Sequence, residues 1–148
     1  MGIFDSFNIN SSGMTAERYR MDVISENIAN VNTTRTEDGG PYVRKVVVFE
    51  EKGNKNTFDS ALKKAAGNYS GYGVKVNGVY EDKATDMIKT YDPSHPDADA
   101  DGYVTYPNVN VITEMTNLID ANRAYETNAT AFSASKSMAQ TGLQLGKA

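Results

Sequence analysis

The chain has 148 residues, of which 15 are basic and 19 acidic, giving a formal net charge of −4. That length predicts one ordinary domain, or a helical pair with a small appended domain. The acidic balance argues against binding to DNA or RNA, whose phosphates attract clusters of lysine and arginine. The chain contains no cysteine, which excludes disulfide bonds and thiolate metal ligands.

The first residues, Met1–Asp5, lack the basic region and the continuous apolar core of a cleavable secretory signal. No apolar run approaches the roughly 18 residues that a transmembrane helix needs. Composition alone therefore predicts a cytoplasmic protein, or a protein that is exported with its N-terminus intact.

A heptad-like apolar stripe predicts a first helix over about Ser11–Val31. Ser11 or Ser12 is expected to cap its start. Side-chain hydrogen bonds from asparagines 27, 30 and 32, and from the threonines that follow, are expected to compete with the backbone and end it. The members of the stripe are Phe7, Met14, Met21, Ile24, Ile28 and Val31.

The middle of the chain has a strand-like pattern of residues and is rich in turn signals. A strand is predicted over Tyr42–Phe49, where β-branched and aromatic residues follow a Gly-Gly-Pro turn signal. Thr57–Ala66 is predicted to be a short helix, Val74–Tyr80 a second strand, and Met87–Tyr91 a weaker third strand. The stretch 92–108, which holds three prolines and four aspartates, is predicted to be an extended loop.

The last segment, about Val109–Leu145, gives the strongest helix prediction, and Asn110 or Thr113 could cap its start. Its stripe advances in alternating steps of four and three residues. The members of this stripe are Val111, Met115, Leu118, Asn122, Tyr125, Ala129, Phe132, Lys136, Ala139 and Leu143.

Two properties of this C-terminal helix indicate partners. A helix of roughly 36 residues would be about 54 Å long, whereas a compact globule of this chain would be only about 38 Å across. Of the last 40 residues, 23 are Ala, Ser, Thr, Asn, Gln or Gly, so the helix lacks the usual charged, solvated face. An intramolecular hairpin without partners is the alternative. A helix that lies on a membrane surface is a second alternative, but it would need a polar face rich in Lys and Arg, which neither terminal helix has.

Two features of the 92–108 loop invite a chemical role. Asp97, Asp99, Asp101, Gly102 and Val104 match five positions of a calcium-binding EF-hand loop. The closing bidentate Glu is replaced by Asn108, and a proline-rich stretch precedes the loop, so a solvated, Asp-capped turn is favoured over a calcium site. His95 is the only histidine, and no nucleophile or orienting carboxylate is singled out as its partner. We therefore identify no catalytic residue, no cofactor site and no metal site from the sequence.

The run from Ser12 to Thr34 resembles the signature of the bacterial flagellar rod and hook proteins. Its core, Asn27-Ile-Ala-Asn-Val-Asn-Thr33, corresponds to the N-(L/I)-A-N-x-x-T element of that family. Segments 101–104, 107–110, 114–115 and 123–128 resemble its basal-body rod members, and only about 51–72 matches loosely. The motif residues are Asn27, Ala29, Asn30, Asn32, Thr33, Pro107, Asn108 and Val109.

The resemblance implies a non-enzymatic, structural subunit of the proximal rod that transmits torque for motility. It implies an α+β fold, mainly α, with long terminal helices paired antiparallel in a coiled-coil-like manner around an export channel. Residues 1–34 with 109–148 would form a discontinuous helical core, and 35–108, including the loop 92–108, a small β-rich outer domain. Such proteins lie in the basal body, on the periplasmic side of the cell envelope, and are exported by the flagellar type III apparatus without a cleaved signal.

The partners implied are other copies of the chain, neighbouring rod proteins, the adaptor between MS ring and rod, and the type III export apparatus. No nucleic acid, small-molecule substrate or cofactor is implied. We expect apolar burial between subunits to supply most of the binding, and the helix ends of the free chain to be frayed. The residues expected to pack are Met14, Met21, Ile24, Ile28 and Val31 against Met115, Leu118, Tyr125, Ala129 and Phe132, with Leu143 beyond them.

Overall fold

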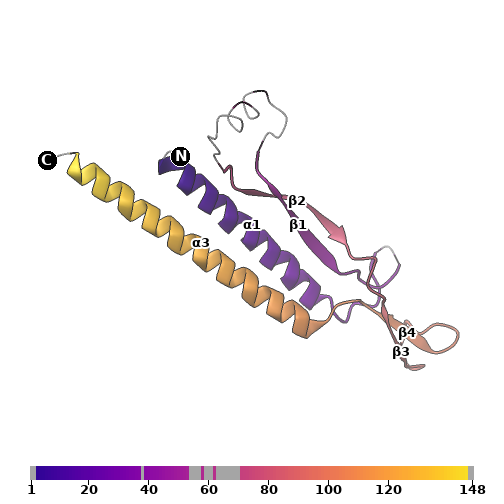
Figure 1. Cartoon of the computed structure of the whole chain (residues 1–148). Helices are drawn as coiled ribbons and strands as arrows, with labels where there is room; N and C mark the ends of the chain where they lie inside the picture. Colours follow the sequence, from indigo (N-terminus) through magenta and orange to yellow (C-terminus); the bar gives the residue numbers. More distant parts are fainter. Residues whose placement is uncertain (1–2, 38, 54–57, 59–61, 63–70, 147–148) are drawn as a thin grey trace. The chain divides into compact units, whose positions relative to one another are not determined.

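A computed structural model of the chain describes residues 3–37, 39–53, 58, 62 and 71–146. The fold is α+β and mainly helical, with a long helix at each end and two small antiparallel sheets between them, as the sequence predicted (Figure 1). The elements are α1 (Ile3–Ala29), β1 (Lys45–Glu51), β2 (Val74–Glu81), β3 (Ile88–Tyr91), β4 (Tyr103–Tyr106) and α3 (Val111–Leu145).

The chain groups into two compact units, each of which takes a segment from both terminal helices. The predicted division into a helical core and an outer domain at residues 34 and 109 remains a prediction. Unit 1 comprises Met1–Tyr19, Phe49–Asn77 and Asn122–Ala148, and unit 2 comprises Arg20–Val48 and Gly78–Ala121.

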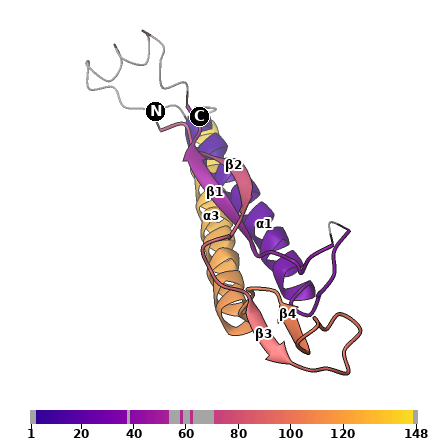
Figure 2. The ribbon, with the colours of Figure 1, turned by 90° about the vertical axis from the view of Figure 1, so that its right-hand side faces the viewer.

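In unit 1 the segments of α1 and α3 lie side by side and run antiparallel (Figures 1 and 2). Phe7 packs edge-on against Phe132 with the ring centroids 5.0 Å apart. Further along α1, a Cβ placed on Gly13 would lie 2.9 Å from the side-chain amide of Asn128. The missing side chain at Gly13 therefore lets the two helices approach closely at this point.

Ser12 is not a helix cap, contrary to the prediction, because α1 begins eight residues earlier than expected, at Ile3. Its hydroxyl donates to the Ile9 carbonyl oxygen at 2.7 Å and accepts a hydrogen bond from the Val74 amide at 3.1 Å. Gly73, which precedes Val74, has a φ of +88°, and a Cβ there would lie 2.2 Å from the Ser12 hydroxyl oxygen. Ser12 thus fastens the start of β2 to α1 within unit 1.

The C-terminal end of α1 was predicted only in part. The Asn30 side chain donates to the Glu26 carbonyl oxygen at 2.9 Å, and the Thr33 hydroxyl donates to the Asn30 side chain at 3.1 Å, as side-chain competition requires. Asn27 does not end the helix, contrary to the prediction, because its side chain is buried and bonded to other segments.

The strands of the middle segment largely follow the pattern of β-branched and aromatic residues. β1 begins at Lys45 rather than Tyr42, because the Tyr42 amide donates to Thr33 and the Arg44 amide donates to the Asn108 side chain. β2 and β3 confirm the second and third predicted strands. The predicted helix at 57–66 falls almost entirely outside the described residues.

The predicted loop 92–108 contains a strand, β4, that the sequence pattern did not predict. β4 pairs antiparallel with β3, with Ile88 opposite Tyr106 and Tyr91 opposite Tyr103. Its four residues, Tyr-Val-Thr-Tyr, have high β-propensity. The aspartates and prolines before them dominated the sequence pattern and concealed so short a strand.

α3 begins as predicted at an Asn110 cap. The Asn110 side-chain oxygen accepts hydrogen bonds from the amides of Ile112 at 3.0 Å and Thr113 at 3.2 Å, which are two of the unsatisfied donors of the first turn. None of the described helices is both long and apolar enough to cross a membrane.

Replacing Asn110 with alanine is expected to lower the free energy of unfolding by about 1 kcal/mol, because the two amides lose their acceptor. Urea denaturation followed by circular dichroism measures this change. Asn110→Asp retains an acceptor and is expected to match the wild type. Equal losses in the two variants would contradict the capping role.

Candidate assembly site

The outer surface of α3 is apolar over its first turns. Ile112, Met115 and Ile119 are 78%, 55% and 54% exposed, and their spacing of three and four residues puts them on one face. We call these three residues the outer face. Within α3 only Glu114 and Ala121 are buried, so the rest of this helix is exposed or half-buried in the single chain. Three large apolar side chains in a row on a solvated helix are typical of an interaction surface.

The residues predicted to pack between the helices differ in exposure. Ile24 is buried, and the other predicted positions of α1 and the turn after it are half-buried, as are Leu118, Tyr125, Ala129 and Phe132. Met115 and Leu143 are exposed in the single chain, so their predicted packing remains a prediction. The inward stripe of α3 includes Glu114 and Ala121, one position before Met115 and Asn122 of the predicted stripe.

A buried polar cluster ties α3 to α1 and β1 inside unit 2. Asn27, which is 1% exposed, donates to the Lys45 carbonyl oxygen at 2.8 Å and to the Glu114 carboxylate at 3.1 Å. Its side-chain oxygen accepts hydrogen bonds from the Tyr42 hydroxyl and the Lys45 amide, both at 2.9 Å. All the hydrogen-bonding capacity of this asparagine is therefore used within the protein.

Arg44 neutralises the cluster. Its Nε and Nη2 donate to Glu114 Oε1 at 3.0 and 2.7 Å, and its Nη1 lies 3.3 Å from Asp82 Oδ2. Glu114 is 1% exposed, and removing such a charge from water is strongly unfavourable without a partner. Burial lowers the pKa of Arg44, but the hydrogen bonds and charges of Glu114 and Asp82 outweigh it, so the pKa is raised above its usual value.

Tyr42 stays protonated at the edge of this cluster. Burial, together with the negative charges of Glu26 and Glu114, raises the pKa of the Tyr42 hydroxyl to about 12. The hydroxyl can therefore act as a donor to Asn27 at any physiological pH.

Asn108 links the cluster to the segment before β3. Its side-chain oxygen accepts a hydrogen bond from the Arg44 amide at 2.8 Å, and its side-chain amide donates to the carbonyl oxygens of Asp82 and Thr85 at 2.7 and 3.1 Å. Pro107 and Val109 beside it are buried too. Three motif residues from the C-terminal half thus form part of the interior of unit 2.

The remaining motif residues lie near the end of α1. Asn30 and Thr33 make the hydrogen bonds that end the helix, while Ala29 and Asn32 are exposed. Glu114 lies within one of the resembling segments, but the sequence pattern assigned no role to it or to Arg44. The sequence gives no direct sign of a buried charge, because glutamate is usually found at the surface.

The carboxylates of the acidic loop accept hydrogen bonds, from the turn after α1 at Asp97 and from within the loop at Asp99. Asp97 accepts a hydrogen bond from the Thr34 hydroxyl at 2.8 Å, and Asp99 Oδ1 accepts from the amides of Asp101 at 3.0 Å and Tyr103 at 2.8 Å. The Asp-capped turn expected from the sequence is therefore present. Nowhere in the described part of the chain do three or more His, Asp or Glu side chains gather closely enough to hold a metal ion.

His95 takes part in the same loop. Its Nδ1 accepts a hydrogen bond from the Asp97 amide at 3.1 Å, and its ring lies 6.3 Å from the Tyr106 ring. With Nδ1 accepting, a neutral imidazole carries its proton on Nε2. The histidine is thus engaged in the loop structure.

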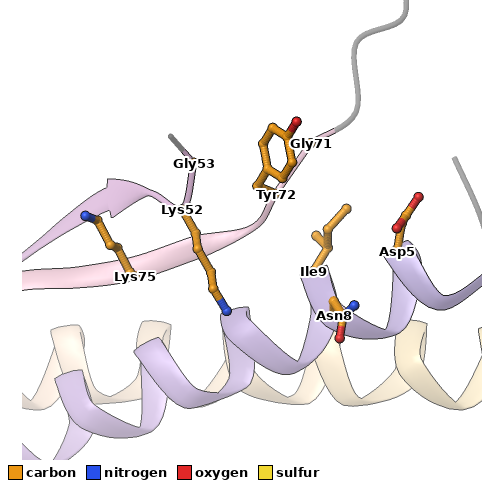
Figure 3. A pocket seen from close by; sticks show the side chains of 8 residues that line it. All are labelled: Asp5, Asn8, Ile9, Lys52, Gly53, Gly71, Tyr72 and Lys75. Atoms are coloured by element: carbon orange, nitrogen blue, oxygen red, sulfur yellow. The ribbon is translucent and has the colours of Figure 1, made fainter. Parts of the chain in front are cut away.

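Unit 1 contains an open groove of about 610 Å³ between α1 and the ends of β1 and β2 (Figure 3). Lys52, which follows the end of β1, reaches towards α1, whereas Tyr72 points away from the helix. Lys75 pairs with Glu50 at 3.4 Å. The residues that line the groove are Asp5, Asn8, Ile9, Lys52, Gly53, Gly71, Tyr72 and Lys75. These mixed charges do not assemble a recognisable catalytic group.

Comparison with known proteins identifies relatives over nearly the whole chain. The family "Flagella basal body rod protein" matches residues 7–35, and the family "Flagellar basal body rod FlgEFG protein C-terminal" matches residues 100–145. The first range contains most of α1, and the second contains β4 and α3.

Curated relatives from several bacteria carry the name flagellar basal-body rod protein FlgC. The protein of Borreliella burgdorferi is 45% identical over 150 residues, covering 98% of each chain. That of Bacillus subtilis is 44% identical over 154 residues, covering 99% of this chain and 100% of the relative. That of Escherichia coli O6:H1 is 38% identical over 147 residues, with the same coverage. The chain belongs to the FlgC family of flagellar basal-body rod proteins.

Proposed function

We propose that the chain is a structural subunit of the flagellar basal-body rod, which assembles with other rod components and is needed for motility. Membership of the FlgC family supports this proposal, since its named relatives are rod proteins. The structural observation that supports this proposal most strongly is the exposure of the three apolar residues of the outer face, Ile112, Met115 and Ile119. Apolar area of this kind contributes about 25 cal/mol per Å² when a neighbour covers it.

The finer proposal concerns how the subunits pack. The paired terminal helices would form the inner wall of the rod around the export channel, with the half-buried and exposed apolar positions of α1 and α3 covered by neighbouring subunits. Torque would then pass between subunits through these helix contacts. The poverty of charge along α3 supports close neighbours on several sides, because solvated helix faces usually carry many Lys and Glu residues.

Two further proposals concern where the chain is located in the cell envelope and how it is exported. We propose that the chain reaches the periplasmic part of the basal body through the flagellar type III apparatus, without cleavage of a signal peptide. There it would meet other copies of itself, its rod neighbours and the adaptor to the MS ring. No catalytic step, cofactor or small-molecule substrate forms part of this proposal.

Phe132→Asp tests the function in a strain that lacks the native gene. Its ring packs against Phe7 at 5.0 Å, so a carboxylate there is expected to separate the helix ends and abolish swimming in soft agar. Ser133→Asp adds the same charge at the exposed neighbouring position, and His95→Ala removes the lone histidine. Both are expected to swim. Full motility of Phe132→Asp, or its loss in His95→Ala, would contradict the proposal.

A further inference from the structure

The buried cluster of unit 2 has a property that apolar packing lacks, namely that only one residue of α3 can complete it. The Glu114 carboxylate accepts from Arg44 at 2.7 and 3.0 Å and from Asn27 at 3.1 Å. These bonds connect the first turn of α3, the last turns of α1 and the residue before β1. Three segments distant in the sequence therefore meet at a single carboxylate.

A shift of α3 along α1 would leave Arg44 without its charge partner. Sliding the helix by one turn would bring Asn110 or Leu118 to the position of Glu114, and neither carries a charge. The next acid in the helix, Asp120, lies six positions on, about 240° around the helix from Glu114. A buried charged group accordingly favours one register far more strongly than an apolar stripe, in which one Leu or Ala can replace another.

Burial is also concentrated at this end of the helix. Glu114 and Ala121 are buried, whereas every described residue of α3 beyond Ala121 is exposed or half-buried. Segments with few buried contacts open at low free-energy cost, and segments joined to a core open only with that core.

We infer that Asn27, Arg44 and Glu114 form a latch, which fixes the register of α1 against α3 in unit 2 and keeps residues 111–121 docked in the free chain. Beyond Ala121, α3 has no buried residue, and its contacts with α1 at Phe132 and Asn128 are only half-buried, so we expect this part of the helix to gain further order from neighbours. The latch is a conformational device that presents the start of α3, with its outer face, in one fixed position before any partner binds. This inference does not rest on the proposed function, because it concerns the unassembled chain.

Hydrogen exchange on the dilute, full-length chain tests the latch. Glu114→Gln keeps the shape and removes the charge, and it is expected to speed amide exchange in residues 111–121 about a hundredfold. Asp120→Asn makes the same chemical change at an exposed site of the same helix. It is expected to change exchange by less than about twofold. Equal exchange in Glu114→Gln and the wild type, or equal acceleration by both variants, would overturn the inference.

A second readout separates a latch from general stabilisation. β4 contains Val104, which is 0% exposed, and its amides are expected to lose much less protection in Glu114→Gln than the amides of residues 111–121. Loss of protection in β4 to the same extent as in residues 111–121 would show that Glu114 merely stabilises the whole unit, and would overturn the latch.

The triple variant Asn27→Leu, Arg44→Met, Glu114→Met tests the register itself. Apolar residues of similar size often preserve stability when they replace a buried ionic group. We expect protection of residues 111–121 to return, but with more than one set of amide resonances in a nuclear magnetic resonance spectrum. A single set with wild-type contacts would refute the role of the charge in setting the register.

Discussion

Arg44→Met is expected to lower the free energy of unfolding by about 3–5 kcal/mol, the largest stability loss of any single replacement considered for this chain. The substitution leaves the Glu114 carboxylate buried at 1% exposure without its cation. Among the described residues, the side-chain amides of Asn27 and Asn117 would still donate to it. Asp82 would also lose its ion pair at 3.3 Å. Urea denaturation followed by circular dichroism gives the free energy of unfolding directly.

Two controls make the Arg44 result specific. Lys83→Met removes a cation whose pair with Glu81 is largely exposed, so its effect is expected to stay within about 0.5 kcal/mol. The double variant Arg44→Met, Glu114→Met removes both charges, and most of the lost stability should return. A loss below about 1 kcal/mol in Arg44→Met, or no recovery in the double variant, would show that the ion pair is not what the cluster depends on.

Ile119→Asp is expected to abolish swimming while leaving the fold of the free chain intact. Ile119 is 54% exposed, and surface substitutions of this kind change stability by only about 0.5 kcal/mol. A charge at Ile119, one of the three residues of the outer face, would have to be desolvated when a neighbour covers the face, which opposes assembly. Motility in a strain without the native gene, together with the circular dichroism spectrum of the purified variant, measures both quantities.

The matched control for Ile119 is Thr113→Asp. Thr113 is exposed on the same helix but lies about 120° away from Ile119, outside the outer face. An acid in the first turn also suits the helix dipole, so folding is expected to be unaffected. Thr113→Asp should swim. Swimming by Ile119→Asp, or its loss in both variants, would remove the outer face as the surface that neighbours cover.

Periodicity predicted the elements that have many repeats. The heptad-like spacing of α1 and the four-and-three spacing of α3 each extend over several turns, so single exceptions such as Lys136 did not hide them. Asn110 was recognisable as a cap because asparagine is among the preferred cap residues and stands just before the pattern. The sequence was therefore sufficient to predict both helices and the first residue of one of them, α3.

Features that depend on contacts between residues far apart in the sequence could not be predicted in the same way. Serine is a residue type that often caps helices, yet Ser12 lies inside α1 because the helix begins at Ile3. The Ser12 hydroxyl instead accepts a hydrogen bond from the Val74 amide. β4 is only four residues long and depends on pairing with β3. Short strands of this kind acquire their definition from a partner strand rather than from their own sequence.

The cluster of unit 2 was the least predictable part of the candidate site. Glu114 stands in the first turn of α3, where an acidic residue is usual for electrostatic reasons and is normally solvated. Its burial follows from Arg44, which lies 70 positions earlier in the chain. Asn27 appeared to be a helix-ending residue for the same reason, because its true partners are 18 and 87 positions away.

We propose that the exposed helix faces of this rod subunit are covered by neighbouring subunits. The most direct test is a cryo-electron microscopy map of assembled basal bodies whose resolution is high enough to place side chains. The account predicts that Ile112, Met115 and Ile119 lie buried against an adjacent rod subunit. A map in which these three side chains face solvent, or in which the chain is absent from the rod, would contradict it.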